Sequence, residues 1–334
     1  MAPIATASPD RGPAIVTTLR NAGSLLDDFI AYHRAIGFQR LYLIFDDPAD
    51  PDLTRVADVP GVRAIACDET LRRAWREVPA FAEMGGSVDQ EVMARQVLNA
   101  ALALRWARAD GHDWLLHIDV DELFHPPGVA ASTWFASLAD QPFDVISFPN
   151  LEAVPESDLC PLPMRNVSLF KTSIDRMRQV VEPNPALADV LRRSRRFGAG
   201  FFNLYSNGKS AARLSNPMTE PMGVHDFGGP GSRRVVAGDA TILHYACCGL
   251  DAFKAKYRLL GNFSDRWWGR YDIAAAIGPF HLQARDVVLR GTDDQIAAFY
   301  RERMSMGADE AEWGLRAGLL ERISSPARLI GMSP

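Results

Sequence analysis

The chain has 334 residues, of which 47% are hydrophobic and 23% charged, so it can bury a globular core. Its formal net charge of -5 at pH 7 gives no bulk attraction for nucleic acid. No apolar run approaches the ~18 residues that a membrane-spanning helix requires. The four cysteines have no CxxC spacing, which argues against a structural zinc site or a disulfide framework.

The N-terminal residues do not have the pattern of a signal peptide. Charged residues interrupt "MAPIATASPDRGPAIVTTLR" before any long apolar stretch. Together with the low cysteine content, this favours a cytoplasmic location, either free or at a membrane surface. Residues 1–13 are expected to form a loose tail.

The first half of the chain alternates between predicted strands and helices. Residues 14–21 are rich in β-branched side chains and predict a buried strand, followed by a helix that Ser24 caps and Gly37 ends. Residues 40–45 and 61–68 are two further short apolar runs. This alternation predicts a mostly parallel sheet flanked by helices.

The pattern continues with a long helix over 88–110 and strands at 114–118 and 144–150. From 155 to 240 it becomes irregular, although "GKSAARL" and "ATILHYA" read as strands. Thr292 and Gln295 predict a capping box, and 310–323 has the apolar spacing of a helix. We therefore expect an α/β half at 14–150, a second half of the same domain at 151–290, and C-terminal helices at 291–334.

Clustered carboxylates follow the strand "WLLHI". Asp119, Asp121 and Glu122 stand where a parallel sheet places its ligands, beyond the carboxyl end of a strand. Residues two apart in an extended chain point the same way, so Asp119 and Asp121 repel each other unless a cation lies beside them. Mg²⁺ and Mn²⁺ prefer such oxygen ligands and often share them with phosphates. An acidic loop that only reaches water is the alternative.

The segment "GHDWLLHIDVDELF" resembles the DxD segment of GT-A-fold glycosyltransferases, especially the family 2-like and family 92-like groups. Further segments are similar in the same order: "VTTLRNAGSLLDDFIAYHRAIGFQRLYLIFDDPADPD", "RQVLNAALALRWARADGHDW", "GKSAARL", "GVHDF" and "ILHYACCGLDAFKAKYRLLGNF". Together they cover most of residues 14–263. The resemblance implies a GT-A-type, Rossmann-like sheet with an irregular acceptor-side second half. One departure is Ala22 in "RNAG", where the family usually has an acid.

The resemblance also implies roles for single residues. Asp121 would be the main ligand of a divalent metal, Mn²⁺ or Mg²⁺, with Asp119 facing the ribose or the metal. A histidine would complete the metal site, His244 first and His225 second. The nucleotide-sugar would meet six further residues: Arg20, Asn21, Asp46, Gln96, Asn99 and Lys209. Each of these also has a structural interpretation, as a buried histidine, a helix-flank amide, a turn former or a surface lysine.

The implied function is transfer of a sugar from a nucleoside-diphosphate donor, UDP-linked, to an acceptor hydroxyl with inversion. The metal would stabilise the departing diphosphate. Inversion requires a general base, for which Glu152 in "NLEAVPESDL" is the chosen candidate among several loop carboxylates. Two alternatives stay open: a sugar nucleotidyltransferase, which the lack of a glycine-rich phosphate loop disfavours, and a non-catalytic nucleotide-sugar-binding protein. The sequence does not identify the donor sugar or the acceptor, which could be a glycan, a lipid-linked group or a protein.

Overall fold

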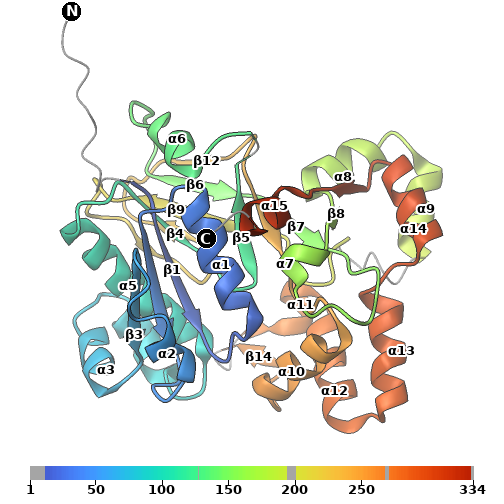
Figure 1. The fold of residues 1–334 in the computed structure, drawn as a ribbon, viewed down its shortest axis with the longest axis horizontal. Coiled ribbons are helices and arrows are strands. Elements are labelled where there is room, and N and C mark those ends of the chain that lie inside the picture. Colours follow the sequence, from blue (N-terminus) through green and yellow to red (C-terminus); the bar gives the residue numbers. More distant parts are fainter. Residues whose placement is uncertain (1–11, 127, 194–200, 268–270, 332–334) are drawn as a thin grey trace, which may run out of the picture. The chain divides into compact units, whose positions relative to one another are not determined.

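A computed structural model describes residues 12–126, 128–193, 201–267 and 271–331, so the predicted tail lies outside the described residues except for its last two. The chain forms two compact units (Figure 1). The first comprises residues 1–148 and 208–241, and the second comprises 149–207 and 242–334. This division differs from the sequence-based one, because residues 208–241 return to the first unit. No described helix combines the length and the apolarity that crossing a membrane would need.

The first unit is built on a seven-stranded mixed sheet in the order β12-β6-β9-β4-β1-β2-β3. Its strands are β1 (Ala14–Leu19), β2 (Arg40–Phe45), β3 (Val62–Ala66), β4 (Trp114–His117), β6 (Val145–Phe148), β9 (Lys209–Arg213) and β12 (Arg234–Val236). Strands β1 to β4 are parallel to one another, whereas β9 runs antiparallel between β4 and β6. The apolar runs at 14–21, 40–45 and 61–68 are thus strands, and the sheet is mixed α/β.

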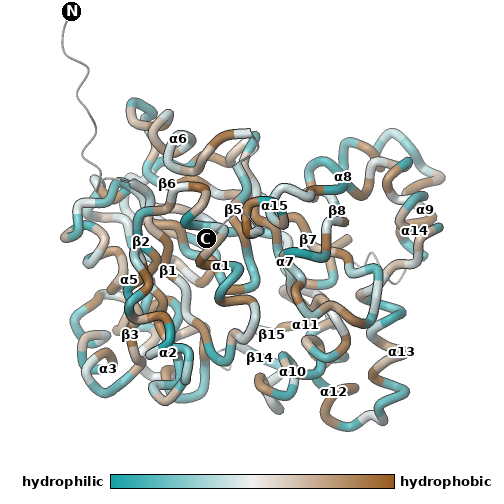
Figure 2. The backbone as a smooth tube through the Cα atoms, viewed as in Figure 1, coloured by the Kyte–Doolittle hydropathy of each residue, from teal (hydrophilic) through white to brown (hydrophobic). Residues whose placement is uncertain are grey.

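Helices connect these strands. They are α1 (Ser24–Ala35), α2 (Pro51–Arg55), α3 (Glu69–Trp75), α4 (Phe81–Met84), α5 (Val92–Ala109) and α6 (Ala131–Ala136). Helix α1 leads from β1 outward to β2, whereas α5 leads from β3 back to β4. Right-handed crossovers in opposite directions place these two helices on opposite faces of the sheet. Strand β1 is accordingly buried at all six residues, and its apolar character is visible in Figure 2.

Two local predictions about this unit need correction. Ser24 is the first residue of α1 and not its cap; Gly23, with φ +57°, holds the cap position without a side-chain hydrogen bond. Glu122 does not lie in an acidic loop, because a short strand, β5 (Glu122–His125), begins with it and buries it fully. The small strands β10 (Glu220–Pro221) and β11 (Phe227–Gly228) complete the unit.

The second unit combines strands and helices around two apolar clusters. Four of its strands follow the order β16-β8-β7-β13: β16 (Leu320–Arg322), β8 (Leu169–Lys171), β7 (Asn150–Ala153) and β13 (Thr241–His244). A hairpin joins β14 (Arg266–Trp267) and β15 (Tyr271–Asp272). The helices are α7 (Pro163–Asn166), α8 (Ile174–Val181), α9 (Pro185–Arg193), α10 (Leu250–Leu260), α11 (Ile273–Ile277), α12 (Phe280–Arg290), α13 (Asp293–Arg303), α14 (Ala308–Arg316) and α15 (Ser325–Gly331).

One apolar cluster of this unit lies among α10, α12 and α13, with Phe253 and Tyr300 fully buried. The other gathers Leu169, Leu187 and Leu320 from β8, α9 and β16. The capping box of Thr292 and Gln295 is confirmed at the start of α13. The predicted helix over 310–323 is only half correct, because α14 ends at Arg316 and residues 320–322 form β16.

Candidate functional site

The carboxyl ends of three parallel strands bring the predicted nucleotide-binding residues to one edge of the first sheet. Arg20 and Asn21 follow β1, Asp46 follows β2, and Asp119 lies two residues beyond β4. Strand β1 lies between β2 and β4 in the sheet. The chain continues from β1 to β2 on one side and later returns to β4 on the other side. Such a reversal of strand order opens a crevice at the carboxyl edge of a sheet, where ligands bind.

Helix α5 ties this edge together through one flank. Arg95 makes a bidentate ion pair with Asp46, with Nε 2.5 Å from Oδ1 and Nη2 2.8 Å from Oδ2. Gln96 donates from Nε2 to Oδ1 of Asp119 over 2.7 Å. Asn99 donates to Thr18 of β1 over 2.9 Å. The ends of β2, β4 and β1 are thus each held by a different residue of one helix.

The pairing of Asp46 assigns a role to Arg95 that the sequence did not give. The guanidinium also donates to the Val88 carbonyl over 2.7 Å, and the side chains of Arg95 and Asp46 are only 13% and 6% exposed. Arg95 directly precedes Gln96 in "RQVLNA". The sequence pattern predicted a site role for Gln96 only, although its neighbour Arg95 was part of the same motif. A bidentate, largely buried pair of this kind fixes the carboxylate in one orientation.

Asn99 has a different environment from Gln96. Its amide accepts from Trp75 Nε1 over 2.9 Å and donates to Thr18, and the residue is fully buried. These contacts lock α3 and β1 to α5. They favour a structural role for Asn99 over the predicted contact with the nucleotide.

The centre of the site is the carboxylate of Asp119. Lys209 Nζ lies 2.6 Å from Oδ2 of Asp119 and 3.5 Å from Oε2 of Glu122. The same Glu122 oxygen accepts the Asp119 main-chain N–H over 2.7 Å. Both side-chain oxygens of Asp119 therefore have partners, Gln96 on one and Lys209 on the other. Even so, the Asp119 side chain remains 29% exposed.

Charge pairing dominates the titration of this cluster. Burial raises the pKa of Asp119, but the charge and hydrogen bond of Lys209 outweigh burial and hold this pKa well below its usual range. Burial lowers the pKa of Lys209, yet Asp119 and Glu122 together outweigh it and raise that pKa. Burial raises the pKa of Glu122 well above its usual range against the opposing charge of Lys209. The lowered pKa of Asp119 and the raised pKa of Lys209 make these two side chains an ion pair at neutral pH.

Two histidines of the first unit belong to the same cluster. His225 Nδ1 lies 2.7 Å from the Gly208 carbonyl, to which it donates. His117, at the end of β4, is buried, and its Nε2 has no hydrogen-bond partner among the described residues. Burial first, and the charge of Lys209 second, lower the pKa of each imidazole to about 3. Both rings are therefore neutral at pH 7. The sequence analysis did not select His117, although it ends β4 and lies two residues before Asp119.

The loop after β1 holds Arg20 and Asn21. Arg20 is half exposed and lies 3.6 Å from Asp47. Asn21 has φ +50°, a left-handed conformation that asparagine adopts more readily than most residues, and its N–H donates to Asp50 Oδ2 over 2.9 Å. The "RNAG" loop is therefore anchored on the acidic turn after β2, even though Ala22 replaces the usual acid.

The remaining predicted residues lie in the second unit. Glu152 on β7 is buried, pairs with Lys171 over 2.6 Å, and accepts the main-chain N–H groups of Asn203 and Leu204 over 3.0 Å. His244 at the end of β13 is 4% exposed, with its ring 4.8 Å from that of Tyr205. A joint metal site of His244 with Asp121 stays a prediction, as does the choice between His244 and His225.

A divalent ion on Asp119 would need an arrangement different from the one observed. Both oxygens of that carboxylate are occupied, one of them by a cation of the chain itself. Within the described residues, no three His, Cys, Asp or Glu side chains come together in a way that could hold a metal. Asp121 is partly exposed and lies in the turn between β4 and β5. The metal role of Asp119 stays a prediction, and the Lys209 ammonium would compete with a metal ion for this carboxylate.

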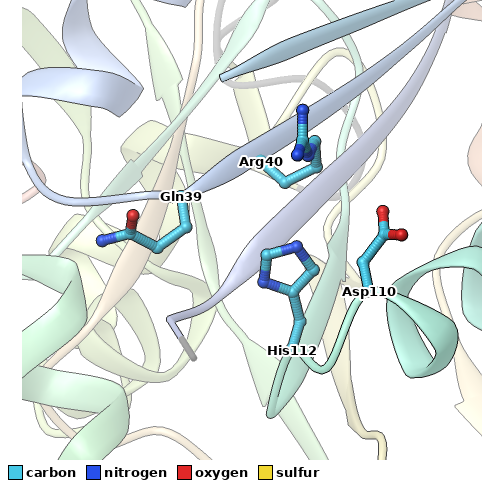
Figure 3. A pocket seen from close by; sticks show the side chains of 4 residues that line it. All are labelled: Gln39, Arg40, Asp110 and His112. Carbon is cyan, nitrogen blue, oxygen red and sulfur yellow. The ribbon is translucent and has the colours of Figure 1, made fainter. Parts of the chain in front are cut away.

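A cavity lies at the opposite, amino edge of the same sheet. Gln39, Arg40, Asp110 and His112 line a space of about 310 Å³, as Figure 3 shows. These residues precede β2 and β4 or open β2, so the cavity is separated from Asp46 and Asp119 by the length of the strands. A variant in this cavity is therefore a control for variants at the carboxyl edge.

Comparisons with known proteins point to one class of enzyme. No protein-family model matches the chain. Two Arabidopsis thaliana proteins, both named glycosyltransferase-like, are similar to it, at 29% and 27% identity over 343 and 341 residues. Each alignment covers 96% of this chain, but 73% of the first relative and 64% of the second. The chain thus spans less than two thirds of the second relative.

Solved structures give weaker similarities. Core-mannan synthase A of Aspergillus fumigatus in its Mn/GDP form has a TM-score of 0.31 at 12% identity, over 64% of this chain and 62% of that one. Mouse xyloside xylosyltransferase 1 has a TM-score of 0.29 at 11% identity, over 61% and 67%.

Proposed function

We propose that this chain is a glycosyltransferase that binds a nucleoside-diphosphate sugar, UDP-linked, at the carboxyl edge of the first sheet. It transfers the sugar to an acceptor hydroxyl with inversion at the anomeric carbon. The observation that carries the proposal is the partly exposed Asp119, held between Gln96 and Lys209 where the strand order reverses. The glycosyltransferase-like relatives, which align with 96% of the chain, support the same class.

The proposed reaction breaks the bond between the anomeric carbon and the oxygen of the β-phosphate. The acceptor oxygen forms the new bond to that carbon and passes its proton to a general base, while the diphosphate leaves with increased negative charge. Catalysis then depends on groups that stabilise the charge of the leaving group. The Lys209 ammonium and the Arg20 guanidinium lie at the edge where that charge would develop, and Asp46 and Asp119 offer acceptors for ribose or base donors.

The proton acceptor is a separate question. Glu152 was the candidate from the sequence, but its carboxylate already accepts from Lys171 and from two main-chain N–H groups inside the second unit. A general base must reach the acceptor hydroxyl within about 3 Å. The contacts of Glu152 support a structural ion pair and not a general base.

The test is a screen of nucleoside diphosphates and nucleotide-sugars against the full chain, first by thermal shift and then by calorimetry. A ligand that binds only the native state raises the melting temperature. Candidate donors are then incubated with and without acceptor sugars, and the released product is identified. Release of a nucleoside diphosphate supports a glycosyltransferase, release of pyrophosphate supports a nucleotidyltransferase, and binding without any turnover supports a non-catalytic protein.

Two variants localise the binding. Asp46→Asn weakens the bidentate pair with Arg95 at the carboxyl edge and is expected to reduce affinity for the nucleotide. Gln39→Ala, in the cavity at the amino edge of the same sheet, is the matched control and is expected to bind normally. Equal loss of affinity in both variants would contradict a site at the carboxyl edge.

A further inference from the structure

The position of a cation beside Asp119 is filled by the chain itself. Lys209 Nζ lies 2.6 Å from Asp119 and donates to the Val224 carbonyl over 3.4 Å, with only 1% of the Lys209 side chain exposed. A lysine this deeply buried is costly unless carboxylates pair with it. Asp119 and Glu122 supply that pairing. The lysine is therefore part of a built site and not a surface side chain.

The sheet fixes Lys209 in this position. Lys209 opens β9, whose next residue, Ser210, pairs with His117 at the end of β4. On its other side Lys209 pairs with Phe148 of β6. Gly208, immediately before it, has φ +67° and accepts the hydrogen bond of His225. Two strands and a turn thus fix the backbone of Lys209, and the contacts with Asp119 and Val224 place its ammonium.

A divalent ion at Asp119 would compete with these contacts. Each Asp119 oxygen keeps a lone pair besides its bond to Gln96 or Lys209, but a metal bound there would lie beside the Lys209 ammonium and bring two like charges together. A displaced Lys209 would be left buried beside fewer counter-charges, which is unfavourable. Lysine and divalent metal are therefore competing occupants of one position.

We propose that Lys209 is the resident cation of this site, and that binding of a nucleoside diphosphate here does not require a divalent metal. The inference rests on the function proposed above and deepens it. An ammonium has three N–H donors and can exchange Val224 or Asp119 for a phosphate oxygen. The charge on the departing diphosphate is then met by a group of the chain. This replaces the Mn²⁺ or Mg²⁺ that the sequence led us to expect.

The first experiment uses the unmodified full chain. Calorimetric titration with UDP and with GDP is done after treatment with a chelator, and again with added Mn²⁺. We expect affinities in the two conditions to agree within about a factor of two, because no interaction with a metal is lost; a loss of ~1.4 kcal/mol would already change the affinity tenfold. Loss of binding in the chelator, restored by Mn²⁺, overturns the inference.

The second experiment removes the ammonium. Lys209→Met is expected to weaken binding of the nucleoside diphosphate by about 10- to 100-fold without metal, the usual cost of a hydrogen bond to a charged group. Added Mn²⁺ should restore part of this affinity, because Asp119 is released to bind it. Lys254→Met is the matched control: Lys254 pairs with Asp293 over the same 2.6 Å in the second unit and should bind nucleotide normally. Normal metal-free binding by Lys209→Met overturns the inference.

The third experiment separates this inference from the proposed function. Mn²⁺ alone is titrated into the unmodified chain, Asp119→Asn, Lys209→Met, and Lys209→Met with Asp119→Asn, and is followed by electron paramagnetic resonance. Only Lys209→Met should acquire a site. A site already present in the unmodified chain and abolished by Asp119→Asn overturns the inference, even where no nucleotide binds. Absence of nucleotide binding in every condition overturns the proposed function instead. If Lys209→Met does not fold, Lys209→Arg, which keeps the charge, replaces it, and unaltered metal-free nucleotide binding is expected.

Discussion

The two units each contain a buried lysine–carboxylate pair with the same separation, 2.6 Å, but in different surroundings. In the second unit, Lys171 and Glu152 are 2% and 3% exposed. In the first, Lys209 is 1% exposed but its partner Asp119 is 29% exposed. Distance alone does not distinguish a structural pair from a binding site. The exposure of the carboxylate does.

The partners of each pair lead to the same distinction. Lys171 also donates to the Phe201 carbonyl, and Glu152 accepts two main-chain N–H groups, so protein atoms satisfy the pair. Burial lowers the pKa of Lys171 despite the attraction of Glu152. The pKa of Lys209 is raised instead, because two carboxylates together outweigh burial. The first unit thus keeps a surplus of negative charge near a buried ammonium, facing solvent.

The largest expected effect is on the structural pair. Lys171→Met leaves Glu152 buried without its cation, and we expect a loss of about 3–5 kcal/mol in the free energy of unfolding. The measurement is urea unfolding. Lys171→Met combined with Glu152→Gln should recover most of the loss, because the amide oxygen can still accept from the main chain.

The contrast between a structural pair and a binding-site pair would be wrong if Glu152 took part in catalysis. A Glu152→Gln chain of near-normal stability that bound donor normally but transferred no sugar would return Glu152 to the role of general base. The unfolding curve and the turnover assay are therefore run on the same preparations.

The next effect is on binding. Asp119→Asn removes one counter-charge of Lys209, but Glu122 remains 3.5 Å away and Asp119 borders solvent. We expect a smaller stability loss than in Lys171→Met, and a fall of about 10- to 100-fold in affinity for nucleoside diphosphate. Calorimetry and urea unfolding together check this. The opposite ranking, a greater stability loss with unchanged affinity, would make both pairs structural.

Much of the first unit follows from local sequence patterns. The apolar runs at 40–45 and 61–68 are strands because buried parallel strands need continuous hydrophobic residues.

In the second unit, the capping box at Thr292 is equally local, because its two partners lie three residues apart. In the C-terminal segment, Gly318 with φ +70° follows α14, and Leu320 then pairs with Lys171 of β8. Strand pairing overrides the helical spacing there.

The arrangement of the site could not be read in this way. Lys209 and Asp119 are 90 positions apart, and Arg95 and Asp46 are 49 apart. A sequence pattern shows which residues are polar, but the counter-charge of each one depends on strand order and register. For that reason Asp119 was expected to need an external cation. Lys209, which pairs with Asp119 in the structure, was expected separately as a contact of the nucleotide-sugar.

Acid should weaken the first unit through His33. Its Nδ1 donates to Phe29 and its Nε2 accepts from the Phe124 N–H, so protonation would break a buried hydrogen bond. Burial lowers the pKa of His33 from 6.5 to about 3. Between these values the unfolded chain binds a proton that the folded chain does not, so stability falls as pH falls. The slope is about 1.4 kcal/mol per pH unit.

His33→Leu tests the assignment. The variant should be less stable at pH 7, but its stability should fall less steeply between pH 6 and pH 4, by about the slope of one titrating group. Urea unfolding across this range measures it. An unchanged slope would show that His33 does not control the acid sensitivity of this unit.

The smallest effect belongs to the start of α13 in the second unit. Thr292 accepts from the Gln295 main-chain N–H, and the Gln295 side chain accepts from the Thr292 N–H over 2.8 Å. Thr292→Ala removes one half of this box and should cost about 1 kcal/mol of stability. Because the box only secures a helix end, nucleotide binding should be unchanged. If this change lowered affinity as much as Asp119→Asn, the separation of a binding unit from a structural one would be wrong.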